Sequence, residues 1–133
     1  MNASLNDHET NSAYLCGRIL AILAKIQQTA MPDVGVGVVQ RYYAAASATP
    51  GLVLGRLVRT AQVAHLPKID SGGLRQWFEN QLSDIWRRLQ TAPPRVLTLE
   101  EQTLFAMGYY HQMAQRSKKA SDSPAAEDPA AEA

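Results

Sequence analysis

Prolines, glycines and capping residues divide the sequence into five segments, and apolar residues recur at helical spacing within them. The first segment, about residues 12–30, begins at Ser12 as a candidate N-cap and ends before Met31-Pro32, because a residue that precedes proline is pushed out of the helical region. Its apolar residues share one face: Leu15, Ile19, Ile22, Leu23 and Ile26. This periodicity predicts a helix.

Three more helices are indicated by their boundaries. A helix over residues 50–67 has Thr49 as its N-cap and a proline at its first position, and a second proline ends it. A helix over residues 74–89 follows a Ser-Gly-Gly turn and carries one apolar stripe. A last helix starts at Thr98, where the letters TLEE form a capping box.

The remaining segment, which begins DVGVGVVQRYYAAASA, is ambiguous. Its alternating valines and glycines hint at a strand, but the sequence offers no second strand to pair with it. We therefore predict a helix from about Val34 to Ala46.

The last helix carries apolar residues around its whole circumference from Leu104 onward, so we expect it to be central and buried. Gly108 lies in its middle, where glycine costs about 1 kcal/mol relative to alanine. A close approach of a second helix would explain this glycine.

The predicted architecture is an all-α fold, a single five-helix bundle with disordered tails. Residues 1–11 are expected to be disordered, residues 12–119 to form the bundle, and residues 120–133 to be a disordered acidic tail rich in Ala and Pro. A chain of 133 residues buries enough surface to fold without disulfides or metal.

The formal net charge of +1 hides an uneven distribution. Residues 14–119 hold all 13 Lys and Arg but only six acids, a net charge of +7, whereas the two ends are acidic. A basic body of this kind favours a polyanionic partner. Lone Cys16 indicates a reducing cytoplasm, and we expect no membrane span and no signal peptide.

Arginine dominates the cations, with nine of the 13, and its planar guanidinium suits phosphate because it donates two parallel hydrogen bonds. Arg18 and Lys25 line one flank of the first helix. We expect Asp84 to form an ion pair with Arg88, four residues further on. Four other arginines are expected to have no acid at helical pairing distance: Arg41, Arg56, Arg59 and Arg87. The candidate nucleic-acid-binding residues are Arg18, Lys25, Arg41, Arg56, Arg59 and Arg87.

Catalysis is not expected. Tyr109, Tyr110 and His111 are adjacent, but neighbours on a helix stand about 100° apart, so these side chains diverge. The histidines show no metal-ligand spacing, the pair Gly35 and Gly37 is no dinucleotide fingerprint, and no nucleophile-elbow motif supports a Ser–His–Asp site. We predict no metal, no cofactor and no small-molecule substrate.

Three segments in order resemble a known family. They are AYLCGRILAILAKIQ at 13–27, RYYAAASATP at 41–50 and LTLEEQTLFAMGYYHQ at 97–112. Together they are similar to the small subunit of the type I-C CRISPR Cascade complex, which is equivalent to the C-terminal helical region of the large subunit. The resemblance covers about 100 residues, and it makes the Tyr-Tyr-His stretch a family signature on a helix.

The resemblance implies a non-catalytic subunit that lines the belly of an RNA-guided complex and stabilises the R-loop. Implied partners are the large subunit, the backbone subunits, further copies of the chain, the target DNA strands of the R-loop and, indirectly, the guide RNA; which strand is contacted stays open. We expect a separately produced subunit without the part that reads the protospacer-adjacent motif. The family offers no phosphate motif to transfer, so the six candidate residues rest on helical faces alone.

Two alternatives stay open. A helical adaptor with only protein partners would account for the mixed charges on residues 74–89 and the apolar last helix. A small hydrolase that uses His65 or His111 has the least support.

Overall fold

The computed structural model describes residues 9–33 and 35–115. This part of the chain contains five α-helices and no strand, so the all-α prediction is confirmed. The predicted tail over residues 120–133, the end of the predicted bundle at 119 and residues 1–8 of the predicted N-terminal tail lie outside the described residues. The elements, in chain order, are α1 (Ser12–Ala30), α2 (Val38–Ala48), α3 (Pro50–Thr60), a π-turn (Ala61–His65), a 3₁₀ turn (Leu66–Lys68), α4 (Gly72–Leu89) and α5 (Leu99–Ala114).

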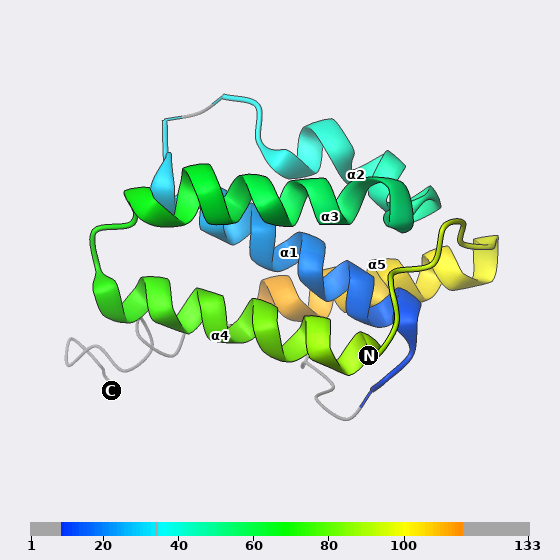
Figure 1. Ribbon diagram of the computed structural model, residues 1–133. Coiled ribbons are helices and arrows are strands. Elements are labelled where there is room, and N and C mark those ends of the chain that lie inside the picture. Colours follow the sequence, from blue (N-terminus) through cyan, green and yellow to red (C-terminus); the bar gives the residue numbers. More distant parts are fainter. Residues whose placement is uncertain (1–8, 34, 116–133) are drawn as a thin grey trace.

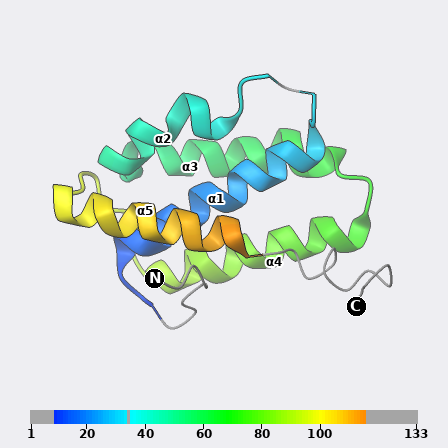
Figure 2. The ribbon, with the colours of Figure 1, turned by 180° about the vertical axis from the view of Figure 1, so that it is seen from behind.

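The central helix is α1. It is buried without interruption over residues 13–23, and α2, α3, α4 and α5 all pack against it (Figures 1 and 2). Only Arg18 and Lys25 are charged among its 19 residues. A helix this apolar on every side is stable only when other elements surround it.

The prediction of a central α5 is wrong, because this helix buries a single face. Its buried residues follow a helical repeat: Phe105, Gly108, Tyr109 and Gln112. Leu99 and Tyr110, which lie off that face, are 81% and 63% exposed. The apolar residues on the remaining circumference include alanine and methionine, which a protein surface tolerates.

Two glycines let the backbones of α1 and α5 touch. A Cβ atom on Gly108 would lie 2.0 Å from the carbonyl oxygen of Tyr14, and one on Gly17 would lie 2.0 Å from that of Phe105. No side chain fits at either place. The close helix approach expected at Gly108 is therefore confirmed, and it is reciprocal.

Several helix boundaries differ from the predictions. The side chain of Asn11, and not Ser12, caps α1 by accepting from the backbone N–H of Ala13 at 2.9 Å. Helix α2 begins at Val38, where Gln27 of α1 accepts the first helical N–H at 2.6 Å, and not at Val34. The capping box at Thr98 and Glu101 forms as predicted, with distances of 2.8 and 3.1 Å.

The predicted helix over residues 50–67 is α-helical only as far as Thr60, and its last turns have other helical geometries. After Thr60 the chain continues as the π-turn and then as the 3₁₀ turn that contains Pro67. Proline lacks an N–H and its ring crowds the preceding turn, so regular α-helical hydrogen bonding cannot run through this position. None of the helices described is both long and apolar enough to cross a membrane.

Candidate nucleic-acid interface

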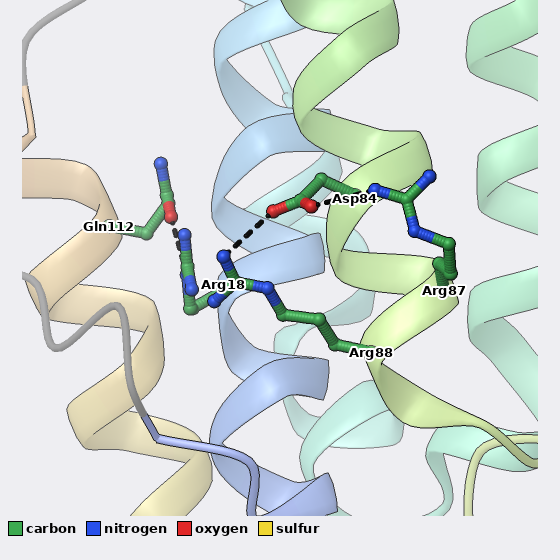
Figure 3. A network of polar contacts seen from close by, with 5 residues as sticks. All are labelled: Arg18, Asp84, Arg87, Arg88 and Gln112. Atoms are coloured by element: carbon green, nitrogen blue, oxygen red, sulfur yellow. Dashed lines mark hydrogen bonds and ion pairs between the residues drawn. The ribbon is translucent and has the colours of Figure 1, made fainter.

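Arg18 is part of the interior. Its side chain lies between α1, α4 and α5 with 2% of the residue exposed, and its Nε donates to the side-chain oxygen of Gln112 at 2.8 Å (Figure 3). The flank of α1 that we expected to face a phosphate backbone is covered, because α1 is the central helix. Arg18 therefore joins α1 to α5 and presents no guanidinium outward.

Lys25 also works within the fold. Its Nζ donates to the backbone carbonyl of Gln112 at 3.2 Å and to that of Gln115. Carbonyls in the last turn of a helix lack intrahelical partners and carry partial negative charge, so a lysine there stabilises the helix end. Burial lowers the pKa of this lysine. Lys25 thus caps α5.

Arg41, Arg56 and Arg59 lie on the surface. Arg41 projects from α2, and the other two project from α3, on the side away from its buried residues Val53, Leu54 and Leu57. None of the three arginine side chains forms an ion pair or a hydrogen bond with residues 9–33 or 35–115. Their charges are available to a partner.

Arg87 differs from the prediction that it is unneutralised. Asp84 lies one turn before it, and one carboxylate oxygen accepts from Arg87 at 3.0 Å while the other accepts from Arg88 at 3.0 Å (Figure 3). Both the three- and the four-residue spacings bring side chains together on a helix. The Arg87 side chain is nevertheless 75% exposed, and exposed pairs contribute at most about 1 kcal/mol, so Asp84 holds Arg87 only weakly.

The predicted divergence of Tyr109, Tyr110 and His111 holds only in part, because the rings of Tyr109 and Tyr110 lie edge to face with 4.9 Å between their centroids. The ring of Tyr109 is buried against Tyr43, with 5.2 Å between the centroids, whereas Tyr110 is exposed. His111 Nδ1 lies 2.8 Å from the hydroxyl of Tyr14 on α1. The three side chains do not converge on one point.

Two further titratable side chains, those of His65 and Cys16, are buried. His65 ends the π-turn, where burial and the nearby Lys68 lower its pKa. Cys16 lies in the core, and burial raises its pKa to about 12, so its thiol stays protonated at neutral pH. Within the described ranges no three His, Cys, Asp or Glu side chains gather as metal ligands would.

An open groove between α3 and α4 was not foreseen. It encloses about 520 Å³ and is lined by Val58, Gln62, Leu82, Ser83, Trp86 and Arg87. Trp86 lies beside the apolar stripe of α4, which consists of Phe78, Leu82, Ile85 and Leu89. A large aromatic residue placed off the apolar stripe of an amphipathic helix is the sequence signal that could have indicated this groove.

The model of a family described as CRISPR-associated protein (Cas_Csd1) matches residues 1–117. No curated protein matches the chain.

Proposed function

The chain belongs to the Cas_Csd1 family of CRISPR-associated proteins, and from this premise we propose that it is the non-catalytic small subunit of a type I-C Cascade complex. In this role it lines the belly of the complex and holds the opened target duplex through contacts to the nucleic-acid backbone. Its partners are the large subunit, the backbone subunits, further copies of itself and the DNA strands of the R-loop.

The observation that carries this proposal is the set of outward arginines. Arg41, Arg56 and Arg59 are exposed on α2 and α3 and face no acid in the described part of the chain. Arg87 adds a guanidinium whose ion pair with Asp84 is exposed to solvent. Four such groups on neighbouring helices supply forked donors for phosphate oxygens.

These contacts need no base-specific geometry. In RNA-guided complexes, pairing with the guide supplies sequence specificity, and protein contacts to the backbone stabilise the opened duplex. A few phosphate contacts bind weakly on their own, but they become effective when neighbouring subunits hold the chain beside the DNA. Arg18 and Lys25 have no part in this mechanism, since they are engaged inside the fold.

The direct test is reconstitution of the guide-RNA complex with and without this chain, with permanganate footprinting of the opened DNA as the measurement. We expect a lower R-loop yield without the chain. Equal yields in both preparations would contradict the proposal.

A helical adaptor with protein partners only is the second candidate. It is favoured by three exposed apolar residues, Leu52, Val96 and Leu99. They lie near the junction of α2 and α3. The loop before α5 is held against this junction by backbone hydrogen bonds from Gly51 to Pro94 and from Leu97 to Ala48. A salt titration of DNA retention separates the candidates. Three or four contacts to a single strand predict a log–log slope of roughly −2 to −3, whereas an adaptor gives a flat response.

A further inference from the structure

The groove between α3 and α4 lies where each helix packs on α1 and the backbones of the two helices stay apart along the described residues (Figure 1). Val58 and Leu82 form apolar parts of its lining. Trp86 stands on the α4 wall and is 37% exposed, although tryptophan is ordinarily well buried. The groove therefore offers one accessible aromatic ring above an apolar base.

Cations flank this ring. Arg87 follows Trp86 and lines the groove. Arg59 comes one residue after Val58 and three before Gln62, both of which line the groove, so helical geometry places Arg59 at the outer rim of α3. No carboxylate is among the lining residues; Glu79 belongs to the adjoining hollow with Gln76 and Asn80. Arg87 shares the carboxylate of Asp84 with Arg88, at 3.0 Å from each, so two guanidinium groups face one acid and this end of α4 keeps a net positive charge.

We propose that this groove binds single-stranded nucleic acid, with one base stacked on Trp86 and the flanking phosphates on Arg59 and Arg87. The inference rests on the proposed function and extends it from backbone contact to base stacking. A stacking platform combined with a cationic rim is how proteins hold single strands without reading sequence. Paired bases cannot reach such a ring, so the groove selects opened strands over duplex.

A partner helix is the other conceivable occupant. A helix bound in a groove is held by several apolar anchors along its length. Here Gln62 and Ser83 alternate with the apolar residues, and arginines stand on both rims. This lining complements a strand with phosphates on both sides of a base better than it complements an apolar helix face.

The test uses the full chain in the reconstituted guide-RNA complex, on target DNA that carries 5-iodouracil in one strand at a time. Irradiation links this base to an aromatic ring that it contacts, and mass spectrometry locates the link. We expect a crosslink at Trp86 on one opened strand and its loss in Trp86→Leu. We also expect Trp86→Leu to weaken strand retention about fivefold or more, while Trp86→Phe, which keeps a ring, retains most of it.

Trp77→Leu is the matched control, because Trp77 is half-buried against the ring of Phe78 on the same helix, with 5.2 Å between the centroids. It should leave the crosslink and the retention unchanged. Circular dichroism of each variant shows whether the helices are intact, and Arg59→Gln with Arg87→Gln tests the same groove without changing its aromatic ring.

Three outcomes overturn the inference in distinguishable ways. Crosslinks elsewhere, with retention unaffected by Trp86→Leu, would reject the groove and leave the proposed function standing. Release of the Trp86→Leu chain from the complex, with no crosslink in the parent chain, would make the groove a protein interface. R-loop yields that do not depend on the chain would reject the proposed function itself.

Discussion

The same residue types have different roles in two regions of the molecule. At the contact between α1 and α5 they hold the fold together, and on the outer face of α3 and α4 they are exposed to solvent. Inside, Arg18 and Lys25 are hydrogen-bonded to α5, and Gly17 and Gly108 bring the backbones together. Outside, Arg56 and Arg59 project from α3, and neither forms an ion pair with an acidic residue in the described part of the chain. Whether an arginine on one of these helices stabilises the fold or is free to bind a partner thus depends on what covers its helix.

The difference follows from how each helix is covered. Other helices pack around α1, so any polar side chain on it must find an internal partner or leave a buried group unsatisfied. Helix α3 buries only the side that holds Val53, Leu54 and Leu57, so its arginines keep their hydration. Substitutions in the two regions should therefore separate stability from binding.

Gly108→Ala should have the largest effect, because the added Cβ meets backbone that cannot move without separating α1 from α5. We expect the free energy of unfolding to fall by roughly 3 kcal/mol or more, measured by urea denaturation. Gly55→Ala is the matched control: this glycine lies on α3 with open space around it, so alanine should stabilise the chain by about 0.5–1 kcal/mol. Equal losses in both variants would erase the contrast.

Arg18→Ala should lower the free energy of unfolding by about 2 kcal/mol, since it leaves the buried side chain of Gln112 without its hydrogen-bond donor. Arg59→Ala on the outer face should change it by no more than about 0.5 kcal/mol. Thermal or urea unfolding of the two variants compares them directly. A small effect at Arg18 would show that the interior does not depend on this cation.

Arg56→Glu combined with Arg59→Glu should weaken nucleic-acid binding without lowering stability. We expect helicity by circular dichroism to stay unchanged, strand retention by the complex to fall about tenfold, and the salt slope to lose about 1.4 as two phosphate contacts disappear. The control is Lys68→Glu with Arg95→Glu, which reverses the same number of exposed charges on other segments. Unaltered retention in the first double variant would show that the phosphate face lies elsewhere.

The burial of Cys16 should make the free energy of unfolding depend on pH in alkaline solution. Burial raises the pKa of this thiol from an ordinary 9.0 to about 12, so the unfolded chain releases the proton first and stability falls as the pH rises. Between pH 7.5 and 9.5 the loss is about 0.8 kcal/mol by urea denaturation. Cys16→Ala should flatten this part of the pH profile; an unchanged slope in that variant would assign the loss to other groups.

Local signals in the sequence were enough for the helices and several of their boundaries. The Thr98–Glu101 capping box, the proline at the start of α3 and the apolar repeat of α1 act over one or two turns, so they operate before any helix meets another. The separation of His111 from the two tyrosines is likewise a property of one helix. Even the glycine contact was foreseeable, because Gly108 is costly in a helix unless something needs its space.

The candidate interface depended on information that no single helix contains. Which of α1 and α5 is central, and hence whether Arg18 and Lys25 meet solvent or α5, is set by how the helices surround one another. The groove at Trp86 likewise exists because α3 and α4 both rest on α1 and stand apart. The sequence by itself determined five helices and a basic body. Only the tertiary packing decided which charges and which aromatic ring remain exposed, because burial is a property of neighbours and not of residue type.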